Sequence, residues 1–139
     1  MPIHVKVINN EGSFNGVMIN GHCNYYNTTD NIIMKGNFEM NKLAGTNNIL
    51  IEFTDTSFIY YYGEFINNRP DGSIIVYEYT GSDNLRNITS ISVQKKNCIY
   101  DAGNLTSVIS EESIMVNIEI NYKYVNSNYF ITEFILTEI

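Results

Sequence analysis

Apolar and polar side chains alternate along the C-terminal part of the chain, which predicts β-structure there. From Ile114 to Tyr124 every second residue is apolar, and most of the residues between them are polar. A period of two is typical of a strand that buries one face. Turn-forming residues at 126–128 separate this segment from a second strand-like segment at 129–139. The pattern predicts a β-hairpin within 104–139, and it allows a short helical turn only at 107–113.

Nearer the N-terminus, a phenylalanine between two glycines occurs three times at a regular spacing. Each unit reads Gly-x-Phe-x6-Gly, and the units begin 24 and then 27 residues apart. Together they use six of the nine glycines, which chance does not explain, so a structural repeat is predicted. The three units are Gly12, Phe14 and Gly21, then Gly36, Phe38 and Gly45, then Gly63, Phe65 and Gly72.

Each unit is expected to form a β-hairpin. In a strand, the first Gly and the Phe lie on the same face, and the missing side chain of the glycine leaves room for the ring. The six residues after the Phe are expected to hold the turn, with the closing glycine at positive φ. Second strands are predicted around Tyr25, at 48–53 and at 73–79, and Thr89, Ile91 and Cys98 are candidates for a degenerate fourth unit.

The predicted fold is therefore all-β: one elongated antiparallel sheet of consecutive hairpins in a single domain. We expect an N-terminal strand in 1–10, the hairpin repeats in 11–103 and the C-terminal hairpin in 104–139. This last hairpin either caps the open end of the sheet or, because its final strand is apolar on both faces, offers an edge for a homodimer.

The third unit reads YYGEFINNRPDG over 61–72 and resembles a MORN repeat, whose pattern is Tyr-x-Gly-x-aromatic, an Asn-Gly-like turn and a Tyr-rich second strand. The units at 35–45 and 12–21 match this pattern less well. Cys23, Asn47 and Ile74 stand where the family has a further glycine. The resemblance covers about 11–82. It implies a protein-interaction or lipid-associated scaffold, which in this family is often a dimer.

The charge of the chain limits the classes of partner. The 15 acidic residues exceed the 8 basic ones, giving a formal net charge of −7. A nucleic acid is therefore not expected as a partner and an anionic membrane is disfavoured, which favours a protein or a neutral or basic ligand. Residues 1–6 lack the apolar core of a signal peptide, and no apolar run approaches the ~18 residues of a membrane span. A cytoplasmic location is expected, with Cys23 and Cys98 as free thiols rather than a disulfide.

No motif for catalysis, a metal or a cofactor is found in the sequence. His22 and Cys23 with Asp30 come closest, but adjacent residues of a strand point to opposite faces. Glu111 and Glu112 are expected to be solvent-exposed residues that precede the C-terminal strand rather than a catalytic acid–base pair. We therefore expect no enzymatic activity, no metal site and no cofactor.

Tyrosines, including the consecutive Tyr60, Tyr61 and Tyr62, are the best candidates for a binding surface, because they combine apolar area with a hydroxyl group. Alternatively, they only shield the sheet through cross-strand pairs. A cytosolic module that binds a protein through an aromatic sheet face, as a homodimer, is the expected function. The alternative is a small viral or phage accessory protein that inhibits a host enzyme or sequesters a small ligand. The tyrosines assigned to partner binding are Tyr25, Tyr26, Tyr60, Tyr62, Tyr77 and Tyr79.

Overall fold

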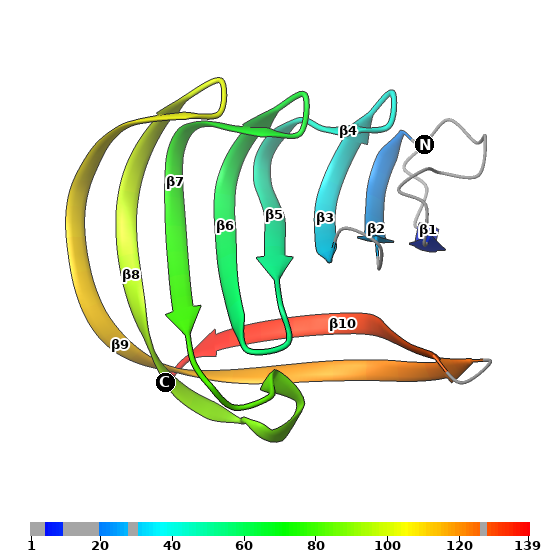
Figure 1. Cartoon of the computed structure of the whole chain (residues 1–139). Coiled ribbons are helices and arrows are strands. Elements are labelled where there is room, and N and C mark those ends of the chain that lie inside the picture. Colours follow the sequence, from blue (N-terminus) through cyan, green and yellow to red (C-terminus); the bar gives the residue numbers. More distant parts are fainter. Residues whose placement is uncertain (1–4, 10–19, 28–30, 126–127) are drawn as a thin grey trace.

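The computed structural model of the chain describes residues 5–9, 20–27, 31–125 and 128–139. They form one open sheet of ten strands, with a single 3-10 turn at Leu85–Asn87 (Figure 1). None of these residues belongs to a helix that is long and apolar enough to cross a membrane. The strands are β1 (Val5–Asn9), β2 (Gly21–Asn27), β3 (Ile32–Glu39), β4 (Lys42–Leu43), β5 (Gly45–Phe53), β6 (Ser57–Ile66), β7 (Arg69–Thr80), β8 (Ser90–Asp101), β9 (Asn104–Val125) and β10 (Asn128–Glu138).

Apart from the short β4, strands that follow one another in sequence are neighbours in the sheet, which confirms the predicted all-β sheet of antiparallel hairpins. The order is β1-β2-β3-β5-β6-β7-β8-β9-β10, and the short β4 pairs with β3. Only β1 runs parallel to its neighbour, β2. The helical turn expected at 107–113 is wrong, because this segment belongs to β9, where its hydroxyl-bearing and β-branched residues pair with β8.

Three tight turns close the hairpins at one end of the sheet, which we call the tip end and which is the top of Figure 1. Both central residues of each turn have positive φ, as a type I′ turn requires. The turns are Met40–Asn41 (φ 48° and 70°), Asn67–Asn68 (48° and 67°) and Ala102–Gly103 (46° and 93°).

Phe38, Phe65 and Tyr100 each stand two residues before one of these turns. The β8–β9 hairpin, which corresponds to the predicted fourth unit, therefore carries Cys98 at the position of the first glycine and Tyr100 at that of the phenylalanine. The register predicted for this unit, with Ile91 as the aromatic position, is wrong. The predicted residue Phe14 lies outside the described residues.

The closing glycines lie beyond the turns, although the sequence placed them within the turns. Gly45 and Gly72 have φ of +86° and +87°, and both belong to second strands. The pairing of β5 with β6 shifts register between Gly45 and Asn48. These glycines thus permit an irregular strand after each type I′ turn, rather than the turn itself.

Neighbouring hairpin tips are joined by the same hydrogen bonds from one unit to the next. The second turn residue donates its N–H to a carbonyl of the preceding tip: Asn68 to Leu43 at 3.1 Å, and Gly103 to Pro70 at 2.8 Å. The first turn residue donates to a side chain in the same way, Met40 N to Asn20 Oδ1 at 2.9 Å and Ala102 N to Asp71 Oδ1 at 3.0 Å. The hairpins are therefore stacked in a fixed register.

Asn48 is the one polar residue among the fully buried side chains of the described residues. Its Oδ1 accepts from Asn37 N at 2.8 Å, and its Nδ2 donates to the carbonyls of Ala44 and Gly45, each at 3.0 Å. A Cβ at Gly36 would collide with this amide. The glycine before Phe38 thus makes room for a buried hydrogen-bonding group, which must be satisfied inside the protein.

Alternation along the strands gives the sheet two faces. On the repeat face, buried side chains include Phe38, Phe65, Ile74 and Cys98. On the opposite, covered face they include Phe58, Tyr60 and Tyr77. The β9–β10 hairpin extends back across the base end of the strands (Figure 1). Its residue Phe134 packs edge-on against Phe58, with ring centroids 5.2 Å apart. The hairpin therefore forms a second layer over part of the covered face, in addition to extending the sheet.

Candidate binding groove

Most of the tyrosines assigned to partner binding do not lie on an open surface. Tyr60 and Tyr77 are each only 8% exposed on the covered face, within the core cluster that includes Phe134 of β10. Tyr62 and Tyr79 belong to the same face, and Tyr62 is 37% exposed. Tyr25 is 3% exposed within the other core cluster, and the side chain of Tyr26 lies outside the described residues. The expected aromatic surface is thus largely the protein's own core, because β10 lies on it.

The end of β10 is attached to the covered face by a charged group. Tyr77 Oη donates to Glu138 Oε2 at 2.6 Å, and Lys95 Nζ lies 2.7 Å from the same oxygen. The hydrogen bonds from Lys95 and Tyr77 lower the pKa of Glu138 below its ordinary value of 4.5. These contacts hold the second layer in place while Glu138 is ionised.

Acid should therefore weaken the fold partly through Glu138. Because its pKa is lower in the folded protein, the unfolded chain binds the proton more readily, so this stabilisation is present above pH 4.5 and is lost as the pH falls through the folded pKa. Glu138→Gln should flatten the pH dependence of the unfolding free energy in that range, as measured by urea titration at successive pH values. The exposed Glu112→Gln is the control, and equal pH profiles for the two variants would contradict this assignment.

The repeat face carries an open groove of about 410 Å³ at the tip end of the sheet. Tyr61 and Tyr100 form its aromatic wall, with ring centroids 6.2 Å apart and planes at 78°. Tyr61 stands between Leu50 and Val76 on the neighbouring strands, whereas Tyr100 stands opposite Gly72, which presents no side chain. The groove is lined by Leu50, Glu52, Tyr61, Asn68, Arg69, Pro70, Tyr100, Ala102, Gly103 and Asn104.

Both phenol groups of the groove remain protonated at neutral pH. Burial, with smaller contributions from Glu52, Tyr100 and Glu78, raises the pKa of Tyr61 to about 12. Burial is also the main cause that raises the pKa of Tyr100. Each hydroxyl can therefore donate a hydrogen bond to a ligand that offers an acceptor.

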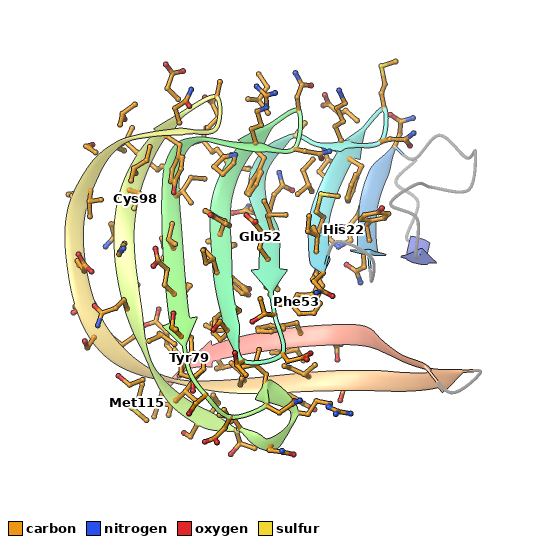
Figure 2. All side chains as sticks on the ribbon, in the orientation of Figure 1. His22, Glu52, Phe53, Tyr79, Cys98 and Met115 are labelled. Carbon is orange, nitrogen blue, oxygen red and sulfur yellow. The ribbon has the colours of Figure 1, made fainter. Side chains whose placement is uncertain are left out.

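Carboxylates lie on the same face beside the tyrosines. Lys96 Nζ is 3.1 Å from Glu78 Oε1 and 4.0 Å from Glu111 Oε1. Glu52 is exposed and makes none of the ion pairs found among the described residues. Figure 2 shows Glu52 part-way along the sheet, above Phe53 and Tyr79, which lie near the crossing hairpin. The groove is therefore acidic on its side away from the tips, whereas Arg69 lies at the tip side.

The other candidates for chemistry do not come together. Within the described part of the chain, no three His, Cys, Asp or Glu side chains are grouped so as to hold a metal ion. Glu111 pairs with Lys96 and Glu112 with Lys95 in adjacent positions of β9, so the two carboxylates point to opposite faces. Cys98 is a buried free thiol whose pKa is raised by burial, which makes it a poor nucleophile.

Comparison of the chain with protein-family models, with curated proteins and with solved structures gave no match. Tyr100 was not among the tyrosines singled out from the sequence, whereas Tyr61 was singled out with its neighbours but was not assigned to partner binding. Tyr100 could have been found from its distance to the Ala102–Gly103 turn, had Cys98 been recognised as a substitute for the repeat glycine. Alternation places Tyr61 on the face opposite Tyr60 and Tyr62, but it does not show which of the two faces is open.

Proposed function

We propose that this protein is a non-catalytic interaction module that binds an extended segment of a protein partner in the Tyr61–Tyr100 groove. The observation that carries the proposal is an open aromatic hollow on the repeat face, while β10 covers much of the tyrosine-bearing opposite face. Tyrosine is enriched at the energetic centres of protein interfaces. The volume of about 410 Å³ suits a short run of side chains rather than a whole domain. The resemblance to MORN repeats points to the same class of function.

Selection of random peptides displayed on phage against the whole protein tests this proposal. We expect enriched peptides whose affinity falls at least about thirtyfold for the double variant Tyr61→Ser, Tyr100→Ser, since a buried aromatic anchor contributes about 2 kcal/mol or more. The matched control is Tyr62→Ser, which changes the exposed neighbour on the other face. Enriched peptides that bind the groove variant and the wild type equally well would refute the proposal, provided that circular dichroism shows both variants folded.

A homodimer is part of the proposal, and the last strand remains its best location. Among the described strands β10 pairs only with β9, so its second edge is open. The part of β9 between Asn104 and Met115 also has a strand on one side only, but its pairing with β8 shifts register twice there. Such bulges protect an edge from further pairing. Light scattering of the whole chain distinguishes the dimer from the monomer.

A further inference from the structure

A second hollow continues the groove toward the base end of the sheet. It measures about 340 Å³ and shares Glu52 with the first. Ile59 and Glu78, which are opposite each other on β6 and β7, also line it. Phe53, Phe58 and Tyr79, which belong to the covered face, line it at the ends of the strands. The two hollows meet at Glu52, and together they extend from the hairpin tips toward the β5–β6 connection, where the second hollow reaches the base edge of the sheet. Such a path suits an extended ligand rather than a compact one.

The ligand cannot bind on this path by adding a strand. Tyr61 lies in β6, which is paired along its length with β5 on one side and β7 on the other. The backbone N–H and C=O groups beneath the ligand are thus already used by the sheet. Affinity must come from side chains alone, which excludes β-strand addition and favours a ligand whose own backbone needs few partners.

A polyproline II helix meets this requirement. It has no internal hydrogen bonds, its carbonyls point outward as acceptors, and proline has no N–H to satisfy. The protonated hydroxyls of Tyr61 and Tyr100 are donors, and rings nearly perpendicular to each other form an apolar recess beside Pro70. Aromatic-lined grooves recognise proline-rich segments in this way, because the ligand loses little conformational entropy.

The charged side chains that line the two hollows indicate where the ligand carries basic residues. Glu52 lies at the junction of the two hollows, and Glu78 lies in the second. Lys96 pairs with Glu78, which leaves the carboxylate of Glu52 to attract a cation. The overall charge of −7 acts in the same direction. Arg69 at the tip end repels a cation there, so the basic residues of the ligand belong at the base end.

We propose that the groove binds a proline-rich segment of a protein in the polyproline II conformation, with its prolines against Tyr61 and Tyr100 and its basic residues beside Glu52. This inference rests on the proposed function and names the class of partner for the same site.

Synthetic peptides titrated into the labelled whole protein and followed by NMR test the inference. The probe is a capped peptide of about seven prolines, roughly 22 Å long as a polyproline II helix, followed by two arginines. We expect amide shifts centred on β6 and the Ala102–Gly103 turn. Affinity should fall at least about tenfold when alternate prolines are replaced by glycine, and by a similar factor when the arginines are replaced by glutamates. Glu52→Gln should reduce the preference for arginine, and Glu64→Gln, an exposed glutamate on the same strand as Tyr61, is the matched control.

The outcomes separate this inference from the proposed function. Absence of binding, equal affinity of the proline and glycine peptides, or equal affinity of the basic and acidic peptides overturns the polyproline assignment. If displayed peptides that depend on Tyr61 and Tyr100 contain no proline, the inference fails while the proposed function stands. If no displayed peptide depends on these tyrosines, both fail.

Discussion

Gly63→Ala is expected to lower the free energy of unfolding by about 3–5 kcal/mol, which is a large part of the stability of a domain of this size. The residue has φ of +148°, a conformation almost confined to glycine. A Cβ at this position would collide with the carbonyl oxygen of Ser73 and would lie 3.1 Å from Ile74 Cδ1. Because the carbonyl oxygen of Ser73 is a backbone atom, a change of side-chain rotamer cannot relieve this collision. Urea denaturation followed by circular dichroism measures the loss.

Gly45→Ala is the matched control for this prediction. Gly45 also has positive φ, +86°, but a Cβ there would meet nothing within 4 Å. The backbone strain alone should cost about 1–2 kcal/mol. If the two substitutions destabilise the protein equally, then the close approach of β7 is not the reason that glycine is required at position 63.

The repeat could be predicted because the same geometry recurs at each unit. Gly36 and Gly63 have φ of +145° and +148°, and Phe38 and Phe65, two residues later, are buried to 1% and 3% exposure. Few other residues are tolerated at this positive φ, so the pattern persists in these two units, whereas Cys98, which does not have positive φ, takes the place of the glycine in the β8–β9 unit. The face on which each strand residue lies could also be predicted from alternation, because each face of the sheet packs against its own core cluster.

The turns at Met40–Asn41 and Asn67–Asn68 lie within the six residues after the Phe, as predicted, but the exact turn residues give a weak signal where they are not asparagine or glycine. Met40 and Ala102 have φ of 48° and 46°, although neither residue type favours positive φ. They are held there by the hydrogen bonds between neighbouring tips, Met40 N to Asn20 and Ala102 N to Asp71. Such bonds depend on stacking of the hairpins, which a single unit does not encode. The register of the β8–β9 hairpin was mispredicted for the same reason, because its turn at Ala102–Gly103 is not evident from the sequence of this unit alone.

The location of the candidate site could not be predicted from the sequence. Alternation places Tyr60 and Tyr61 on opposite faces of β6, but it does not say which face another element covers. That is decided by β10, whose Phe134 meets Phe58 and Tyr60 across a long separation in sequence. The tyrosines first assigned to binding lie on the face that receives this layer, and the open groove is on the other face.

Phe134→Ala should destabilise the protein by about 3–5 kcal/mol and release the second layer first. Phe134 is 1% exposed, and its ring contacts Phe58 at 5.2 Å and Tyr60 at 6.3 Å between centroids. Its removal leaves a cavity between β10 and the sheet, where the remaining contacts of the strand include the exposed Glu138. Urea denaturation gives the loss in free energy, and amide hydrogen exchange shows where protection falls.

Thr137→Ala is the matched control, because Thr137 is an exposed residue of the same strand and should change stability by less than about 0.5 kcal/mol. In Phe134→Ala, exchange should quicken in β10 and in the half of β9 paired with it, while β5, β6 and β7 stay protected. Peptide binding by the folded fraction should be unchanged, because the groove lies on the opposite face. Uniform loss of protection over all strands would mean that the hairpin and the repeats unfold as one unit, and the description of β9–β10 as a separable layer over the repeats would then be wrong.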